Sequence, residues 1–360
     1  MDSSSPEWRE KNMIDIKSLT LPELQEEMEK IGEKKFRAGQ IYEWMHVKLV
    51  DSFDEMTNLS KGLREKLKEQ YELISLELVE VQTSKIDETS KFLFRLSDGN
   101  VIESVLMKYH HGNSVCISSQ VGCRMGCRFC ASTLDGLERG LKPSEMLDQI
   151  YKIQKWSQER VHNVVVMGTG EPLDNYDSLL RFIHLLTDEG GLHISQRNLT
   201  VSTCGIVPNM RRLADEKLQI TLALSLHASS QEKRKTLMPV AYKFDLKDVL
   251  DACRYYFEQT GRRITFEYSL VGGVNDSSED ARELTELVKD LNCHINLIPV
   301  NPIKERDYVQ SDSRAILNFK NKLEKSGINV TIRREMGRDI DGACGQLRKS
   351  YMDTEKERGE

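Results

Sequence analysis

Three cysteines crowd into one short segment of the chain. Cys123, Cys127 and Cys130 form a C-x3-C-x2-C pattern directly after an extended apolar run. Cysteine thiolates are strong ligands for zinc and for iron–sulfur clusters. A [4Fe–4S] cluster normally takes four cysteines, so three would leave one iron open for a substrate. The triplet therefore predicts a catalytic metal centre.

Two alternatives begin from the same cysteines. A structural zinc site would need a fourth ligand, and Cys116 and His111 are the nearest candidates. A disulfide framework fits the chain less well. It has 8 Cys in 360 residues, no hydrophobic signal segment at its start and no spacing typical of small secreted folds. We therefore expect reduced cysteines and a cytoplasmic location.

The composition sets limits on the class of protein. With 39% hydrophobic residues, the chain can bury a full-sized core and a smaller appended domain. Its apolar stretches are strand-sized, which predicts no membrane span. The net charge of −6 gives no overall signal for nucleic acid, so an RNA site would have to be a local patch. Four short basic runs are candidates, although each is more typical of a solvated face than of a binding site: Lys34-Lys35-Phe36-Arg37, Lys233-Arg234-Lys235, Arg262-Arg263 and Arg333-Arg334.

The pattern changes along the chain and predicts three regions. Residues 13–75 have helical periodicity, with a capping box at Thr20-Leu21-Pro22-Glu23 and a stop at Gly32, and form a helical accessory domain. Residues 76–113 contain strand-like runs and a turn at Asp98-Gly99-Asn100, which predicts a connecting β-hairpin region. Residues 114–350 form the core.

Strands and helices alternate through this core. The expected strands are 114–119, 163–168, 199–203, 220–226, 263–270, 294–299 and 329–333. The expected helices are 144–156, 177–186, 207–214, 246–258, 278–291 and 311–326. Repeated β-α units predict a parallel α/β fold, either barrel-like or doubly wound. In both, ligand sites lie at the carboxyl ends of the strands.

Polar residues follow several of these strands. Gly168-Thr169-Gly170-Glu171-Pro172 offers a close backbone approach and a carboxylate, although a G-x-G pattern alone is weak. Ser202, Ser225-Leu226-His227 and Asn301 come at or after the ends of later strands. Singly, each is more typical of a turn or a structural residue. Together they favour a shared site.

Three residues outside the triplet could also do chemistry. Cys116 lies on the strand that leads to the triplet. Cys344 lies between glycines in a loop near the end, which suits approach to a reaction centre, although a loop cysteine without a role is equally compatible. Glu103 falls on a hairpin strand, where nothing local distinguishes it from a surface carboxylate. Cys253 and Cys293 are expected to be inert core residues.

These motifs resemble, in order and over nearly the whole chain, the RlmN/Cfr family of radical S-adenosylmethionine (SAM) RNA methyltransferases. The segments that carry the resemblance are Cys116 to Cys130, Met167-Gly168-Thr169-Gly170-Glu171-Pro172-Leu173, Ser225-Leu226-His227-Ala228 and the run from Asp339 to Leu347. Within the family they are similar to the dual-specificity branch that methylates adenosine C2 in 23S rRNA and tRNA. The Cfr branch, which methylates C8, is the alternative, and a zinc-stabilised RNA-binding protein without catalysis is a remote one.

The resemblance implies a fold and a set of roles. The fold would be a partial (β/α)6 barrel with an N-terminal helical accessory domain, and the core would end in a loop that carries the catalytic cysteine. Cys123, Cys127 and Cys130 would hold a [4Fe–4S] cluster. Cys344 would carry the methyl group, Cys116 would resolve the intermediate and Glu103 would accept a proton. SAM would contact a set of strand-end residues: Gly170, Glu171, Ser202, Ser225, Leu226, His227 and Asn301.

The implied chemistry explains why so many groups are needed. Adenine C2 is not nucleophilic and cannot attack the SAM methyl group directly. In the family one SAM methylates Cys344, and a second yields a radical that takes hydrogen from that methyl group. The carbon then adds to C2, and Cys116 releases the product by forming a disulfide with Cys344. The implied partners are 23S rRNA in the peptidyl-transferase centre, tRNA at the adenosine 3′ of the anticodon, and an electron donor such as flavodoxin or ferredoxin. We expect a monomer.

Overall fold

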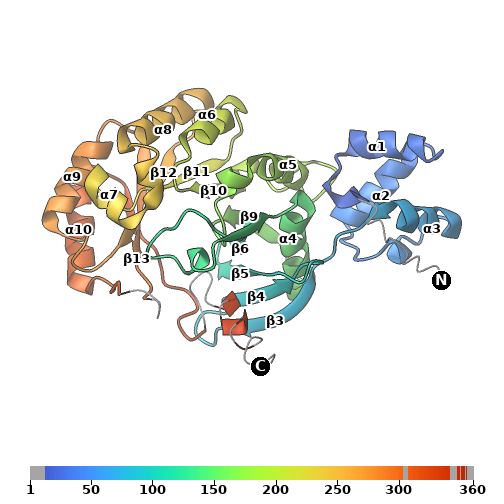
Figure 1. Ribbon diagram of the computed structural model, residues 1–360, viewed down its shortest axis with the longest axis horizontal. Coiled ribbons are helices and arrows are strands. Elements are labelled where there is room, and N and C mark those ends of the chain that lie inside the picture. The colour runs from blue at the N-terminus through green and yellow to red at the C-terminus, as the bar shows by residue number, and fades with distance from the viewer. Residues whose placement is uncertain (1–12, 303–306, 341–346, 349, 353, 355–360) are drawn as a thin grey trace, which may run out of the picture.

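The computed structural model describes residues 13–302, 307–340, 347–348, 350–352 and 354. Its N-terminal part is helical, with α1 (Leu21–Lys30), α2 (Phe36–His46) and α3 (Lys61–Gln70) at one end of the molecule (Figure 1). The expected capping box is present at Thr20 and Glu23. Two short strands, β1 (Ile14–Asp15) and β2 (Tyr71–Glu72), pair in parallel where this part begins and ends.

Buried polar contacts join this helical part to the rest of the chain. Lys17, in a short 3-10 helix (Ile16–Ser18), forms a 2.6 Å ion pair with Asp148 on α4 (Pro143–Ser157). His46 lies 2.8 Å from the hydroxyl of Tyr151 on the same helix. The hydrophobic core is continuous across the junction. The division of the chain at residues 75 and 113 remains a prediction.

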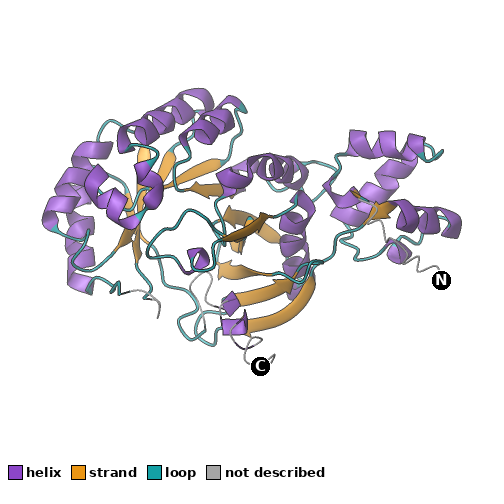
Figure 2. Ribbon diagram, viewed as in Figure 1, coloured by secondary structure: helices purple, strands orange, loops and turns teal. Residues whose placement is uncertain are grey.

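A mixed sheet forms the centre of the molecule (Figure 2). It has ten strands in the order β14-β13-β12-β11-β10-β9-β6-β5-β4-β3. Three strands pair antiparallel at one side: β3 (Glu77–Thr83), β4 (Ser90–Arg95) and β5 (Val101–Tyr109). This is the expected hairpin region, and Gly99 makes its turn with φ +85°. β5 then pairs antiparallel with β6 (Gly112–Ile117).

From β6 onward every neighbouring pair in this sheet is parallel, which confirms the α/β prediction. The further strands are β9 (Val161–Val166), β10 (Leu199–Thr203), β11 (Thr221–Ser225), β12 (Ile264–Leu270), β13 (Cys293–Pro299) and β14 (Val330–Ile332). β14 and β3 lie at opposite edges and do not pair with each other, so the described barrel is partial rather than closed. The strands from β9 to β14 follow one another across the sheet in chain order, without the reversal of a doubly wound sheet, so the architecture is barrel-like.

Helices connect the parallel strands at the expected places. They are α4, α5 (Tyr176–Thr187), α6 (Val207–Asp215), α8 (Leu246–Thr260), α9 (Ser278–Val288) and α10 (Ser313–Lys325). One more helix, α7 (Gln231–Leu237), was not predicted. Short 3-10 helices occur at Phe53–Glu55, Ala131–Thr133, Pro172–Asn175, Gln196–Asn198 and Pro239–Tyr242. Among the described residues, no helix has the length and apolar character needed to cross a membrane.

Candidate active site

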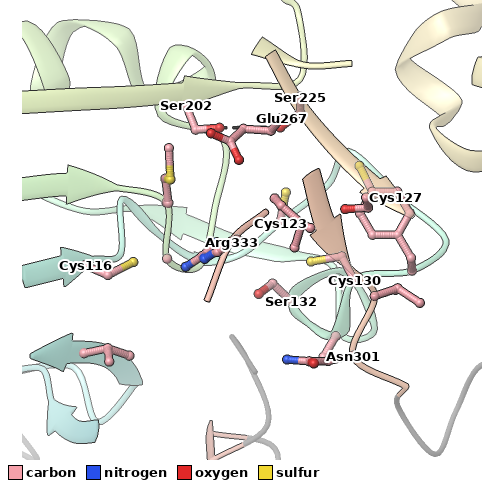
Figure 3. Close-up of a pocket in the computed structure, with 18 of the residues that line it drawn as sticks. Cys116, Cys123, Cys127, Cys130, Ser132, Ser202, Ser225, Glu267, Asn301 and Arg333 are labelled. Carbon is pink, nitrogen blue, oxygen red and sulfur yellow. Dashed lines mark hydrogen bonds between the residues drawn. The ribbon is translucent and has the colours of Figure 1, made fainter. Parts of the chain in front are cut away.

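A cavity of about 540 Å³ opens at the carboxyl ends of the parallel strands, the position expected for a barrel. Its size is typical of a pocket for a small organic ligand. Ten residues that the sequence singled out line it: Cys116, Cys123, Cys127, Cys130, Gly170, Glu171, Ser202, Ser225, His227 and Asn301. Figure 3 shows Cys116 away from Cys123, Cys127 and Cys130.

The three clustered cysteines lie on a loop that a small hairpin closes. Strands β7 (Gln120–Gly122) and β8 (Leu137–Gly140) pair antiparallel, and the N–H of Cys123 donates to the carbonyl of Gly136 at 2.7 Å. Gly122 has φ +74°, and a Cβ there would lie 2.0 Å from that same carbonyl oxygen. Only glycine fits this position, so the start of the loop is fixed by backbone geometry.

Further hydrogen bonds hold the loop in shape. The N–H of Cys130 donates to the carbonyl of Cys127 at 3.2 Å, and the Thr133 hydroxyl donates to the carbonyls of both cysteines. The N–H of Arg128 donates to the carbonyl of Leu237 in α7 at 2.9 Å. The three thiols are therefore presented to the cavity by a fixed backbone.

Burial makes the thiols of Cys123 and Cys127 poor acids in the absence of a bound cation. It raises the pKa of Cys123 to about 12, with smaller contributions from Cys130 and Glu171, and it also raises the pKa of Cys127. A metal centre reverses this effect, because a coordinating thiol is deprotonated by the charge of the metal. The donor set thus suits a cationic centre that binds thiolates.

The geometry does not support a single zinc ion. Within the described part of the chain, no three His, Cys, Asp or Glu side chains are grouped closely enough to hold one metal ion. His111 precedes β6 whereas the cysteine loop follows it, so the two lie at opposite ends of the strand. In a [4Fe–4S] cluster each thiolate binds a different iron, and the three sulfur atoms need not converge on one point.

The loop after β9 contributes a close backbone approach and a buried carboxylate. Gly170 has φ +109°, and a Cβ there would lie 2.6 Å from the Gln120 side chain. Glu171 is 4% exposed, and its carboxylate accepts the N–H groups of Leu173 and Cys204 at 3.0 and 2.7 Å. Burial raises the pKa of this carboxyl group, and these hydrogen bonds oppose the effect.

His227 is held in a single tautomer at the end of β11. Its Nδ1 accepts the N–H of Ser269 at 2.9 Å, which leaves the ring hydrogen on Nε2. Burial lowers the imidazole pKa to about 3, with a further contribution from Arg234, so the ring is neutral. The ring packs edge-on against Phe129 of the cysteine loop, with 4.8 Å between centroids. Its φ of +54° is strained for a non-glycine residue, as is common at functional sites.

Ser202 and Ser225 end β10 and β11 side by side, with 3.4 Å between their hydroxyl oxygens. Leu226, by contrast, is fully buried and is not part of the cavity lining. Its backbone N–H donates to the carbonyl of Glu267 at 3.0 Å. Asn301 is exposed and lines the cavity after β13.

Glu103 is buried, which corrects the expectation of a surface carboxylate. It is 4% exposed and lies 3.3 Å from the ammonium group of Lys91, a fully buried residue of β4 that lines the cavity. Glu103 also accepts the backbone N–H of Arg348. The C-terminal segment covers this face of the sheet, with Leu347 packed on Leu93 and Val101. Glu103 itself is not part of the cavity lining.

Cys116 is 4% exposed on β6 and lines the cavity. Its expected partner, Cys344, lies outside the described residues. The expected disulfide between Cys116 and Cys344 therefore remains a prediction. Cys253 is fully buried in α8 and Cys293 is 8% exposed, as expected for core residues.

A charged residue of the cavity wall, Glu267, was missed from the sequence. Glu267 on β12 is 5% exposed and accepts a hydrogen bond from the side chain of Asn296 at 2.9 Å. Burial raises the pKa of its carboxyl group, and the guanidinium of Arg333 opposes that rise. Figure 3 places Glu267 beside Ser202 and Ser225. Glu267 lies inside β12, so the sequence gives no strand-end signal for it.

Comparisons with known proteins agree with this geometry. Residues 14–73 match the family described as the ribosomal RNA large subunit methyltransferase N-terminal domain, and residues 117–287 match the radical SAM superfamily. A crystal structure of a radical SAM methyltransferase from Sphaerobacter thermophilus superposes with a TM-score of 0.89 at 41% identity, covering 92% of this chain and 98% of that one. The fold and the cysteine loop therefore define a radical SAM enzyme.

The relatives define the family more narrowly. A protein of Lachnospira eligens named "Probable dual-specificity RNA methyltransferase RlmN" is 71% identical over 341 residues, covering 95% of this chain and 97% of its own length. A protein of Lachnoclostridium phytofermentans with the same name is 67% identical over 94% of this chain and 96% of its own length. The chain belongs to the RlmN/Cfr family of radical SAM RNA methyltransferases.

Radical SAM enzymes use a [4Fe–4S] cluster and SAM. The residues present fit both. The cavity offers three thiols on a fixed loop, and the hydroxyls and carboxylates of its walls are the partners that the amine and ribose of SAM require.

Proposed function

We propose that this protein methylates C2 of an adenosine in 23S rRNA and of the adenosine 3′ of the anticodon in tRNA, through a methylated cysteine. The observation that supports this proposal most directly is that Cys116 opens into the same cavity as Cys123, Cys127 and Cys130. A thiol that is not a cluster ligand, held where the radical forms, is what a cysteine-mediated methyl transfer needs.

In this proposal Cys123, Cys127 and Cys130 hold the cluster, and the remaining cavity wall holds SAM. Gly170 lets the ligand approach the backbone, while Glu171, Ser202, Ser225 and Asn301 supply polar contacts. The neutral ring of His227 donates from Nε2, and Leu226 contributes through its backbone. Glu267 lies beside the two serines and is suited to accept hydrogen bonds from the ribose hydroxyls.

The protein residues then carry out the transfer. The thiolate of Cys344 takes the methyl group of one SAM by displacement, and S-adenosylhomocysteine leaves. When bound, the cluster and a second SAM supply a 5′-deoxyadenosyl radical, which removes one hydrogen atom from the S-methyl group. The carbon attached to Cys344 forms a bond to adenine C2.

Release of the product needs a second cysteine and a base. The Cys116 thiolate attacks the sulfur of Cys344, so that an S–S bond forms as the S–C bond breaks. The one unpaired electron that the adduct carries would return to the cluster when the cluster is bound. Glu103 accepts the proton from C2, and the new methyl group gains one proton from solvent. The support for Glu103 is its ion pair with Lys91 on the cavity wall and its contact with Arg348, four residues after Cys344. A thiol reductant resets the cysteine pair.

Two measurements test the proposal. Anaerobically purified protein should contain about four iron and four sulfide per chain, and Cys123→Ala should lose them because two thiolates cannot retain the cluster. Incubation with SAM, a low-potential reductant and RNA fragments should yield 2-methyladenosine by mass spectrometry. A colourless zinc protein would refute the enzyme assignment, and 8-methyladenosine would instead assign the chain to the C8 branch.

A further inference from the structure

Arg234 on α7 is a charged residue buried behind the wall of the cavity. Its side chain is 0% exposed and is the largest of the fully buried ones. Nη2 donates to the carbonyl of Cys204 at 2.6 Å and to the carbonyl of Ser225 at 3.4 Å. These two carbonyls lie at the carboxyl ends of neighbouring strands, β10 and β11, directly behind the wall of the cavity.

The other two donor nitrogens of this guanidinium are unsatisfied. Among the described residues, neither Nε nor Nη1 has a hydrogen-bond partner. A buried cation with unpaired donors is costly unless an opposite charge compensates it. Burial lowers the pKa of this guanidinium, and three nearby thiols, Cys204, Cys127 and Cys253, oppose that effect.

The position of Arg234 connects it to the cysteine loop. It lies three residues before Leu237, whose carbonyl accepts the N–H of Arg128. Cys204 and Leu237 pack in one apolar cluster with Met238, and Cys127 and Phe129 pack against that cluster. Arg234 therefore stands behind a thin apolar layer that also contacts one of the three loop cysteines.

The missing negative charge would come with the iron–sulfur centre. An oxidised [4Fe–4S] core carries two positive charges, so three thiolates make the ligated centre negative, and one added electron makes it more so. In a medium of low dielectric constant, a nearby fixed cation stabilises the reduced form preferentially. Charge and burial around a cluster are among the features that set its reduction potential.

We propose that Arg234 is a positioning residue that balances the negative charge of the cluster held by Cys123, Cys127 and Cys130, and so raises its reduction potential. This role rests on the proposed function, in which those cysteines are the ligands. The balanced step is the entry of one electron from an external low-potential donor into the oxidised cluster, with no proton transferred.

Three variants separate charge from structure. Arg234→Gln removes the charge, and Arg234→Lys keeps it while losing the fork of donors. Arg262→Gln is the matched control. Arg262 donates to the hydroxyl of Thr221, the first residue of β11. Its replacement by glutamine therefore removes one positive charge at the end of β11 that lies opposite Ser225. Iron, sulfide and thermal unfolding are measured first, followed by a redox titration monitored by electron paramagnetic resonance without SAM.

At the midpoint potential of the wild-type cluster, we expect the ratio of reduced to oxidised cluster in Arg234→Gln to fall about tenfold, which for a one-electron couple equals about 59 mV. Arg234→Lys and Arg262→Gln should stay within about twofold of wild type. Loss of the cluster in Arg234→Gln with retention in Arg234→Lys would also support the proposal, because the charge would then be required for binding.

Other results would overturn it. If Arg234→Gln retains the cluster with an unchanged potential, the charge has no effect on the cluster. If Arg234→Lys and Arg234→Gln both lose the cluster, Arg234 acts only by holding the carbonyls of Cys204 and Ser225 in place. A wild-type protein that binds zinc in place of iron would overturn the proposed function itself, which distinguishes that failure from the failure of this role.

Discussion

The ammonium group of Lys91 lies 3.3 Å from the carboxylate of Glu103, and both side chains are buried. Lys91 is on β4 and its side chain lines the cavity. Glu103 is on the neighbouring strand β5, where it pairs with Leu93 of β4. The backbone N–H of Arg348 donates to the same carboxylate. The proposed base is thus fixed between the cavity and the segment that follows Cys344.

Replacement of this carboxylate should stall the last step of the reaction. Glu103→Gln keeps the shape of the side chain but cannot accept the C2 proton, so turnover should fall by roughly 10² to 10⁴. Cluster content and methylation of Cys344 should remain normal, and RNA bound covalently to the protein should accumulate. Lys91→Met keeps the base but loosens its position, so it should slow product release less. Normal turnover in Glu103→Gln would exclude Glu103 as the proton acceptor.

Substitution of Gly122 or Gly136 tests the geometry of the cysteine loop and leaves Cys123, Cys127 and Cys130 unchanged. Gly122 and Gly136 both have φ +74°, so alanine at either position costs about 1–2 kcal/mol in backbone strain. In Gly122→Ala the new Cβ would also displace the Gly136 carbonyl, which holds the N–H of Cys123, whereas the space around Gly136 is open. Gly122→Ala should therefore lose bound iron and Gly136→Ala should retain it. Equal iron content in the two variants would show that this closure does not matter.

Variants of Cys344 and Cys116 should fail at different steps of the reaction. Cys344→Ala lacks the methyl carrier, so neither methylated RNA nor an adduct should form. Cys116→Ala should still transfer the carbon to adenine but cannot break the S–C bond, so a nuclease-resistant nucleotide should remain on the Cys344 peptide in mass spectra. Cys253→Ala, which alters a core cysteine, is the control and should release product normally. Free methylated RNA from Cys116→Ala at the wild-type rate would remove Cys116 from the mechanism.

His46 should make the stability of the protein dependent on pH. Burial, with the nearby charge of Lys17, lowers its pKa to about 3 in the folded state from the ordinary 6.5. Between these values the unfolded chain binds a proton that the folded chain does not, so stability is full above pH 6.5 and falls on acidification. From pH 7.5 to 5.5 this residue alone should cost about 1.4 kcal/mol.

The measurement is anaerobic urea unfolding of wild type and His46→Gln at the two pH values. The variant retains a partner for the hydroxyl of Tyr151 but has no group that titrates in this range. Wild type should therefore lose about 1.4 kcal/mol more than the variant on acidification. The same pH dependence in both proteins would show that His46 is not held neutral.

Much of the fold could be predicted because the physical signals are local. The amphipathic helices and the runs of β-branched residues in strands such as β9 and β10 are visible in the sequence, and parallel strands bring their carboxyl ends together. The residues at those ends, Ser202, Ser225 and His227, could therefore be placed in one site before their contacts were known.

What could not be predicted depends on contacts between distant segments. α7 is short, and its sequence from Gln231 to Leu237 lacks an apolar period, so the Lys233-Arg234-Lys235 run suggested a solvated patch. Arg234 is instead fully buried, because the ends of β10 and β11 close over it. Glu103 was expected at the surface because nothing near it in sequence shows that Lys91 and the C-terminal segment cover it.

The central claim is methyl transfer to adenine C2 through a cysteine-bound carbon, and one isotope measurement tests it most directly. The protein with its cluster is incubated with a low-potential reductant, an rRNA fragment and SAM that carries a CD3 methyl group. Because one deuterium is removed before the carbon joins the base and a solvent proton replaces it, the product should be 2-methyladenosine with two deuterium atoms in its methyl group. Three retained deuterium atoms would mean direct displacement, and methylation at another position of the base would contradict the assignment to C2.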